Sequence, residues 1–270
     1  MDPPRGGAST SSELEKHSSG SVSLYVKYHD LHGGEQESRK SNYADLANKY
    51  YDLVTGFYEY GWGDSFHFAG GYPGETSREA IKRHQHFMAL QLGLKKGMKE
   101  HIFSAGLSEQ CCSLKGDFMN MPIADNTFDA AYAIQATCYA PEAQGVYSEV
   151  YRVLKPGQYF ALDEWCLTDR FDPNNAKHLT AKAEIELGDG LPDIRTTRQC
   201  VQAMKDAGFE VNTLEFLRIA PAGSVGAYNV LTSASDGLLK GGREGIFTAS
   251  FFVLGRKPLK ESEIVNGGNL

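Results

Sequence analysis

The chain has 270 residues, of which 41% are hydrophobic and 23% are charged, and its formal net charge is −7. This balance is ordinary for a globular protein and provides apolar surface for one large domain or two small ones. Lysine and arginine form no basic cluster, which argues against a nucleic-acid partner because phosphate binding needs such clusters.

The first 92 residues predict a polar tail followed by helices. Residues 1–36 begin with small polar residues and no apolar core, which is typical of a disordered tail rather than a signal peptide. Apolar residues at helical spacing predict a helix from about Glu37 to Gly56. The segment "FYEYGWGDSFHFAGGYPG" (57–74) shows neither the helical nor the strand spacing of apolar residues and is expected to be a loop. A second helix should begin near Thr76, which has capping-box spacing with Glu79, and end near Gly93.

The rest of the chain alternates between strands and helices. Strands are expected at 112–119, 127–135 and 158–166, with a closing, antiparallel strand at 245–256. A helix begins at Pro141 and a second covers about 197–207. This alternation predicts an α/β fold of the doubly wound, Rossmann-like kind, with a mostly parallel sheet covered on both faces. Residues 93–257 would form this domain, after a helical segment at 37–92 and before a polar tail at 258–270.

The cysteines and histidines suggest no metal site. The five cysteines form no CxxC pair, and their odd number and low density favour a reducing compartment over a disulfide framework. Cys111 and Cys112 lack partners at zinc-ligand spacing, and His84 and His86 point in different directions on a helix. No apolar run approaches the 18 residues of a membrane span, although peripheral attachment leaves no such signal.

Three motifs in the second half occur in a recognisable order. Asp117 is expected at a strand end, "DNTFD" (125–129) precedes a buried strand, and "EVYRVLKPG" (149–157) precedes another. Over about residues 92–210 this order resembles the S-adenosylmethionine-dependent methyltransferases of the doubly wound class. The resemblance implies that Asp117 and Phe118 flank the adenine, and that Ile134, Gln135 and Ala136 face cofactor and substrate at the carboxyl ends of the strands. Asp117 could instead be a turn residue that caps the next segment.

Other stretches resemble one family within that class. "YEYGWGDSFHF" (58–68) is similar to the sterol-binding signature of the sterol C24-methyltransferases, as are "YAIQATCYAP" (132–141), "EWCLTD" (164–169) and "IELGDGLPDIRTT" (185–197). The plant-type branch, which acts on cycloartenol, is the most similar. The resemblance implies methyl transfer from S-adenosylmethionine to C24 of a sterol side chain in sterol biosynthesis. It also implies peripheral association with the endoplasmic reticulum or microsomal membrane surface, a cytoplasmic location otherwise, and a homo-oligomer.

The aromatic signature suits that chemistry. Methylation of an alkene creates a carbocation, and desolvated aromatic faces stabilise a cation by roughly 0.5–2 kcal/mol each. The resemblance implies catalytic roles for Glu59, Tyr60 and Gln135, with Glu59 orienting the sterol hydroxyl or acting as an acid–base group. Expected sterol-binding residues are Tyr58, Trp62, Phe66 and Phe68. The alternative is that these aromatic residues only close a small core.

One part of the family pattern is missing from the sequence. The family places a strand, a turn of the form G-x-G, a helix and a second strand after "GLKKGMK" (93–99), yet here "GMK" runs directly into "EHIFSAGLSEQC" (100–111). A βαβ unit needs about 30 residues. We therefore expect an incomplete sheet without its first strand, glycine loop and second strand, with the strands at 113–119 and 128–135 side by side. S-adenosylmethionine binding should be impaired.

Further departures weaken the expected activity. A second gap follows "GFEV" (208–211), Gln135 stands where the family has Glu, Tyr139 where it has His, and Asp163 where it has Tyr. Three functions stay open on these residues: a sterol methyltransferase, a catalytically inactive sterol-binding or partner-binding splice product, and a methyltransferase of another small molecule. The sterol signature argues against the third.

Overall fold

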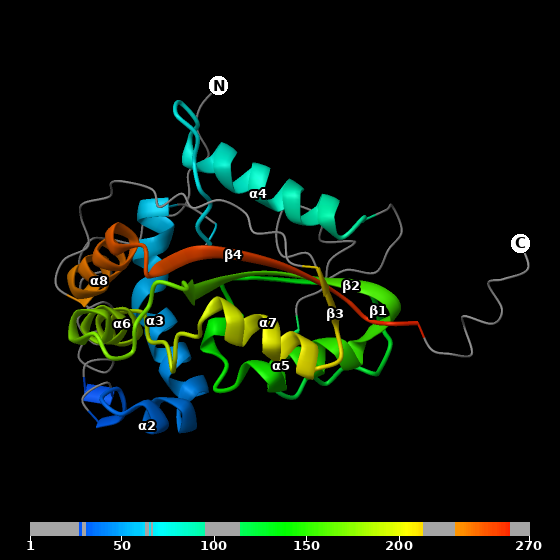
Figure 1. Cartoon of the computed structure of the whole chain (residues 1–270), viewed down its shortest axis with the longest axis horizontal. Helices are drawn as coiled ribbons and strands as arrows, with labels where there is room; N and C mark the ends of the chain where they lie inside the picture. Colours follow the sequence, from blue (N-terminus) through cyan, green and yellow to red (C-terminus); the bar gives the residue numbers. More distant parts are fainter. Residues whose placement is uncertain are drawn as a thin grey trace, which may run out of the picture.

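The computed structural model describes residues 27–28, 31–62, 65, 67–94, 114–212 and 230–259. In this part of the chain, N-terminal helices are followed by a region of alternating strands and helices (Figure 1). The elements are α2 (Gln36–Ser41), α3 (Tyr43–Trp62), α4 (Ser77–Gln91), β1 (Phe128–Ile134), η1 (Thr137–Tyr139), α5 (Ala143–Val153), β2 (Leu154–Leu167), α6 (Ala176–Gly188), α7 (Thr197–Asp206), β3 (Glu210–Asn212), α8 (Val230–Glu244) and β4 (Phe247–Arg256).

The sheet has four strands in the described residues, in the order β1-β2-β4-β3. β1 and β2 are parallel and are joined through α5, whereas β4 is antiparallel to both β2 and β3. The α/β class and the antiparallel closing strand are confirmed. The expectation of a mostly parallel sheet is wrong for this part of the chain, because β4 returns between β2 and β3 and makes two of the three pairings antiparallel.

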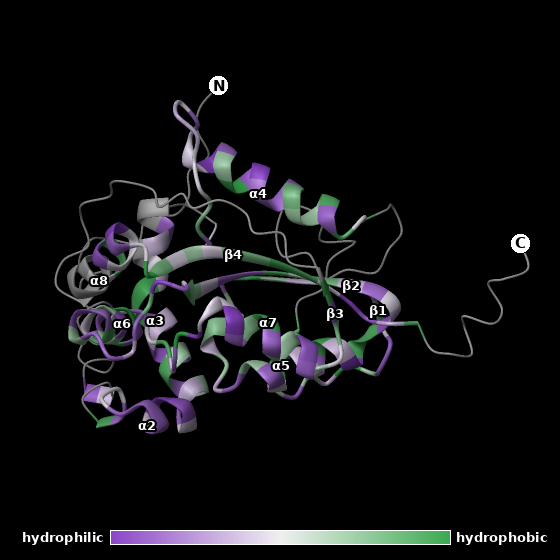
Figure 2. Cartoon of the chain, viewed as in Figure 1, coloured by the Kyte–Doolittle hydropathy of each residue, from purple (hydrophilic) through white to green (hydrophobic). Residues whose placement is uncertain are grey.

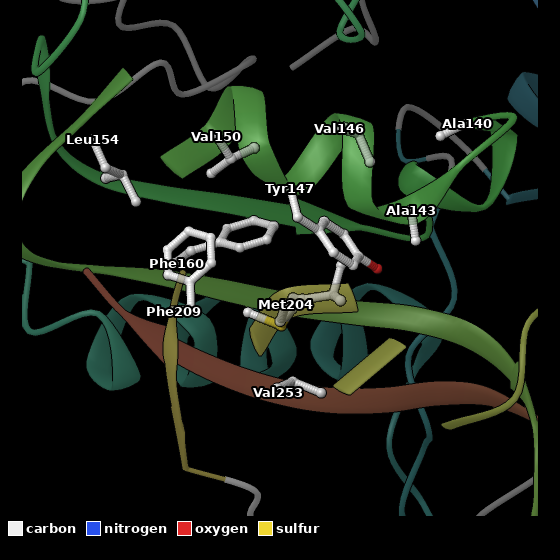
Figure 3. Close-up of a cluster of buried hydrophobic side chains, with 11 residues drawn as sticks. Ala140, Ala143, Val146, Tyr147, Val150, Leu154, Phe160, Met204, Phe209 and Val253 are labelled. Carbon is white, nitrogen blue, oxygen red and sulfur yellow. The ribbon is translucent and has the colours of Figure 1, made fainter. Parts of the chain in front are cut away.

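Helices α5 and α7 cover one face of the sheet. Figure 3 shows the cluster between them and the strands, in which Tyr147 of α5 and Phe160 of β2 lie together with Met204 of α7 and Phe209. Each of these four side chains is at most 4% exposed. The helix predicted after Pro141 is therefore confirmed as α5, and its Val146 and Val150 belong to this cluster.

Helix α4 covers the opposite face, so that the sheet lies between two helical layers (Figure 1). Met88 and Leu92 pack against Ala130 and Ala161, and Phe87 meets Phe252 of β4 edge-on at 4.9 Å. Apolar and polar residues alternate along α4 in Figure 2, as expected for a helix with one buried face. Its predicted start is confirmed, because Thr76 and Glu79 form both hydrogen bonds of a capping box.

A second group of helices lies at the end of the sheet where α3, α6 and α8 meet (Figure 1). α6 packs against α8, and a buried cluster joins Ile185 of α6 to Trp165 of β2 and Phe247 of β4. Arg39 of α2 forms a buried ion pair with Glu186 of α6 at 2.7 Å. No helix in the described ranges is long and apolar enough to cross a membrane.

Two predicted elements differ from the structure. The helix expected over 37–56 is divided at Asn42, and its second part continues to Trp62, so the first residues of the predicted loop are helical. Helical backbone hydrogen bonds can continue through Gly61 at the helix end, where glycine costs little. The strand expected at 112–119 is wrong for residues 114–119, none of which is in a strand. Asp117 begins a turn here, in which its Oδ1 accepts from the Met119 N–H at 2.8 Å. These residues therefore do not lie beside β1 as a strand.

Candidate functional site

The sterol-like signature spans the end of α3 and the segment that follows it. Tyr58 is half-buried and Glu59 is exposed, whereas the side chains of Tyr60 and Trp62, and the whole of Phe66, lie outside the described residues. Phe68 packs on Trp165, with ring centroids 6.0 Å apart. The structure thus places Phe68, at one end of the signature, against β2 and Tyr58, at the other end, beside Tyr50 of α3, and the roles of the signature residues stay predictions.

Gln135 joins the signature to the sheet. It follows β1 with a left-handed φ of 50°, and its side chain is buried. The Oε1 atom accepts from the Phe68 N–H at 2.8 Å, and Nε2 donates to the carbonyl oxygens of Phe68 at 3.2 Å and Ala249 at 2.9 Å. An amide can both donate and accept in this way, and a carboxylate cannot. Gln135 therefore clamps Phe68 to β4, and its predicted catalytic role stays a prediction.

A line of polar groups runs from the signature into the protein. The Tyr58 and Tyr50 hydroxyls are 2.8 Å apart, and the Tyr50 hydroxyl donates to Oδ1 of Asp189 at 3.4 Å. Beside this line, the Tyr51 hydroxyl donates to the Tyr139 hydroxyl at 3.2 Å. Burial raises the pKa of Tyr51 to about 12, so these phenols are neutral and act as hydrogen-bonding groups. Four tyrosines and one carboxyl group thus gather where α3 meets η1 and the end of α6.

Asp189 is the one carboxyl group in this cluster. It is 3% exposed, and its Oδ2 atom has no hydrogen-bond partner in the part of the chain that the structure describes. Burial raises its pKa to about 7, although the hydrogen bond from Tyr50 acts in the opposite direction. The group therefore changes its charge near neutral pH inside an aromatic cluster.

Asparagine at position 189 should stabilise the protein at high pH. The native pKa of Asp189 lies above the ordinary value of 3.8, so native protein binds more protons than unfolded protein between about pH 4 and pH 7, and stability falls as pH rises through this window. Asp189→Asn removes the buried charge and retains an oxygen acceptor for Tyr50. We expect a gain on the order of 2 kcal/mol at pH 8.5 and little change at pH 4, measured by urea unfolding. An equal effect at both pH values would contradict this assignment.

Asp163, one of the departures from the family pattern, lies on the α4 side of the sheet. Its side chain is fully buried, with Oδ2 3.0 Å from Nε2 of His84 and Oδ1 accepting from the Ser250 hydroxyl at 2.7 Å. Its backbone oxygen accepts from the Gln135 N–H at 2.7 Å. A buried carboxyl needs such partners. The Asp163–His84 pair therefore links α4 to β2, next to the residue that clamps the signature.

The residues expected around the cofactor are only partly assembled. Oδ2 of Asp117 accepts from the Tyr43 hydroxyl at 2.6 Å, and its Oδ1 is engaged in the turn, so both carboxylate oxygens already have protein partners. Phe118 lies 6.4 Å from the Tyr43 ring. Ile134 packs on the α4 side of the sheet, and Ala136 is exposed after the end of β1. Asp117 therefore also fulfils its alternative role as a turn residue.

The described residues do not fit S-adenosylmethionine well. Backbone amides of a glycine turn must approach such a ligand closely, and an acidic side chain at the end of a neighbouring strand is needed for the ribose hydroxyls. In the ranges described around β1, neither a glycine turn nor a second such strand is present. Residues 95–113, where the sequence places the gap, lie outside the description. No group of three or more metal-ligating side chains occurs in the described residues.

Comparison with known proteins agrees with the fold. The profile described as "Methyltransferase domain" matches residues 71–162, and "Sterol methyltransferase C-terminal" matches residues 197–259. The geranyl diphosphate C-methyltransferase from Streptomyces coelicolor A3(2) has a TM-score of 0.56 at 13% identity, covering 80% of this chain and 97% of that one. A further geranyl diphosphate methyltransferase structure also has a TM-score of 0.56, at 14% identity, with 79% and 96% covered. The fold is that of a Rossmann-like methyltransferase.

Sequence relatives define the family within this class. Cycloartenol-C-24-methyltransferase 1 of Oryza sativa subsp. japonica is 45% identical over 335 residues, covering 95% of this chain and 96% of the relative. The cycloartenol-C-24-methyltransferase of Arabidopsis thaliana is 44% identical, covering 88% and 94%. The chain belongs to the sterol C24-methyltransferase family, whose S-adenosylmethionine-dependent enzymes methylate C24 of a sterol side chain.

The length of the alignment with the Oryza sativa relative is relevant to the segment that is missing after Lys99. It spans 335 positions, more than the 270 residues of this chain, and covers nearly all of both proteins. Stretches of the relative must therefore stand opposite gaps in this chain. This agrees with the expected internal omissions without locating them.

Sequence reasoning missed the Asp189 cluster. In the sequence, the stretch "IELGDGLPDIRTT" shows only the family likeness, and nothing distinguishes Tyr50 and Tyr51 from other positions of the helix predicted over 37–56. The signal available was a lone Asp–Gly pair after an apolar helix, which is far more often a simple helix end. Only the packing of α3 against that helix end brings Tyr50 to the carboxyl group.

Proposed function

We propose that this chain is a sterol-binding member of the family that binds S-adenosylmethionine very weakly and does not methylate cycloartenol. The observation that supports this proposal best is the described sheet, in which β1 is an edge strand that pairs only with β2, and β4 and β3 follow on the far side of β2. A complete site would need the glycine turn and the ribose-binding acid on the other side of β1. The sequence has no such motif between Gly93 and Asp117.

Methyl transfer is the alternative function, and the family relationship favours it. A radiolabelled methyl-transfer assay with cycloartenol distinguishes the two. We expect incorporation at the level of the protein-free blank for two reasons. Gln135, fixed by three hydrogen bonds, cannot act as a base, and the chain lacks the glycine turn whose backbone amides would bind the cofactor. Turnover above that blank would contradict the proposal.

The signature should still contribute to sterol binding. Trp62 lies at the last position of α3, four residues after Tyr58, so both belong to the same end of the helix. Trp62→Ala should weaken sterol binding about tenfold or more, since burying a large aromatic side chain against an apolar ligand is worth about 1.5–3 kcal/mol. Lys177→Ala is the control, because Lys177 is exposed on α6, away from this segment. Equal sterol affinities for the two variants, measured by fluorescence titration, would count against the assignment.

The sterol substrate itself suggests where the protein acts. We propose peripheral association with the endoplasmic reticulum or microsomal membrane surface, because a water-insoluble sterol must be taken from a membrane. We also propose that the chain forms a homo-oligomer, as the family resemblance implied. Vesicle co-sedimentation with and without sterol tests the first proposal, and sedimentation equilibrium tests the second. Protein that stays in the supernatant, or a monomer at all concentrations, would contradict them.

A further inference from the structure

Four exposed residues form one line along the outward side of α4. They follow one another at spacings of four residues: Arg78, Lys82, His86 and Leu90. Because this spacing nearly matches one helical turn, the line runs along one side of the helix for about 18 Å. We propose that this α4 outer face docks on a membrane surface that carries anionic lipid headgroups. The proposal rests on the peripheral membrane association proposed above, for which it names the surface and the lipid.

The outer face is accessible because α4 buries its other side. Met88 and Leu92 pack on the sheet, and Figure 1 shows α4 as the outermost helix on this side of the sheet among the described elements. Leu90 is 76% exposed, more than any other large hydrophobic residue in the described part of the chain. An open groove of about 440 Å³ lies beside it, lined by Glu79, Lys82, Arg83, His86, Phe87 and Leu90. An exposed apolar side chain of this size is stabilised when it enters the headgroup region of a membrane.

The charges on this face favour an anionic partner. Helix α4 has three cationic side chains and one anionic side chain, although the whole chain has a formal net charge of −7. Arg83 is neutralised by Glu75 at 2.8 Å, and Glu79 is occupied in the capping box. Arg78 and Lys82 have no hydrogen-bond or ion-pair partner within the described residues. Each of these two cations can attract anionic headgroups, which raises the affinity about fivefold per cation.

Docking through α4 would also bring the sterol signature to the membrane. The His67 ring lies 5.5 Å from the ring of His84, and Nε2 of Gln85 lies 3.1 Å from Nε2 of His67. Arg83 donates to the carbonyl oxygen of Gly70. These contacts hold the end of the signature and the residues after it against α4. A sterol that leaves the bilayer beside α4 is then close to the last residues of the signature.

The same charges argue against a second copy of this chain as the partner. In a twofold dimer the same patch faces itself, so Arg78 and Lys82 of one copy would approach those of the other. Like charges that face each other across an interface disfavour it. Leu90 is the single apolar residue of the line, and one such residue does not supply the apolar core of a stable protein interface.

Co-sedimentation of the full chain with vesicles of two compositions tests this surface. One set contains phosphatidylcholine only, and in the other about one third of it is replaced by phosphatidylserine, at about 0.1 M salt. We expect the affinity for the anionic vesicles to be about tenfold higher or more, since two cations contribute about fivefold each. The difference should disappear at about 1 M salt, where charges are screened beyond about 3 Å. Equal affinity for the two vesicle types at the lower salt concentration would overturn the proposal.

A pair of double variants tests whether the cations of α4 are responsible. Arg78→Gln/Lys82→Gln should lose about tenfold in affinity for the anionic vesicles and nothing for the neutral ones. Lys177→Gln/Lys205→Gln is the control, because it removes the same charge from exposed positions on α6 and α7. This control should bind both vesicle types as the parent chain does. Equal losses for the two double variants would mean that net charge, and not the α4 outer face, determines binding.

The apolar end of the line has its own variant. Leu90→Ser should weaken binding to both vesicle types about fivefold or more, because it removes the side chain that enters the headgroup region. Leu179→Ser is its control, since Leu179 is 46% exposed on α6, and it should bind as the parent chain does.

The outcomes separate this inference from the proposed membrane association. If the parent chain stays in the supernatant with every vesicle, the membrane association itself fails. If the parent chain binds vesicles and the α4 variants bind them equally well, only the α4 outer face fails as the docking surface. It fails as well if Leu90→Ser leaves vesicle binding unchanged and instead reduces self-association in sedimentation equilibrium.

Discussion

Insertion of the family's strand–glycine turn–helix–strand segment after Lys99 should increase the affinity for S-adenosylmethionine about a thousandfold or more. Two or three hydrogen bonds to charged or strongly polar ligand groups would be regained, at about 1.5–3 kcal/mol each. The donor of the segment is the rice relative, which is 45% identical to this chain. Calorimetric titration of both proteins measures the difference.

A matched insertion shows whether the glycine turn is responsible. The same segment with both glycines of the G-x-G turn changed to valine restores the strands but blocks close approach of the backbone. We expect this protein to fold and to bind S-adenosylmethionine as weakly as the parent chain. Methyl transfer should stay low even with the intact segment, because Gln135 remains. If the intact insertion leaves the affinity for S-adenosylmethionine unchanged, the missing segment does not explain the weak binding of the parent chain.

Arg39→Ala should cause a large loss of stability. The Arg39 side chain is 6% exposed, and its guanidinium donates to Glu186 and to the carbonyl oxygens of Leu191 and Pro192. Removing one partner of a buried ion pair leaves the other uncompensated, and this costs about 3–5 kcal/mol. Lys182 still contacts Glu186, which should keep the loss near the lower end of this range. Urea unfolding followed by circular dichroism measures it.

Arg198→Ala is the matched control. Arg198 pairs with Asp169 at 3.0 Å, but its side chain is 80% exposed. Exposed pairs contribute about 0–1 kcal/mol because water screens them. Equal losses for the two arginine variants would mean that the contact of α2 with the end of α6 does not stabilise this fold.

The fold could be predicted where local signals and packing agree. Thr76 and Glu79 mark the start of α4 correctly because a capping box is a local arrangement. The strand at Phe128–Ile134 and the face of α5 follow from periodicity. Residues 57–62 were assigned to a loop because glycine and aromatic residues obscured the period, although helical packing of Tyr58 against Tyr50 overrides that composition. Helices α6 and α8 are not predicted from the sequence, because the apolar residues of α6 have only a weak helical period and α8 contains Gly237, Gly241 and Gly242, which are unfavourable in a helix.

The candidate site was predictable only through family resemblance. The resemblance drew attention to Gln135, and the structure adds its three hydrogen bonds to Phe68 and Ala249, which lie 67 and 114 positions away. No local pattern could reveal such partners. The same holds for Asp189, whose neighbour Tyr50 lies 139 positions away in the sequence.

Calorimetric titration of S-adenosylmethionine into the purified, unmodified chain tests most directly whether the cofactor half of the site is missing. Sterol binding in the same preparation shows that the protein is folded. We expect no saturable heat up to about 1 mM ligand, which corresponds to a binding free energy weaker than about 4 kcal/mol. A micromolar dissociation constant with one site per chain would contradict the claim that this protein lacks the segment needed to bind S-adenosylmethionine.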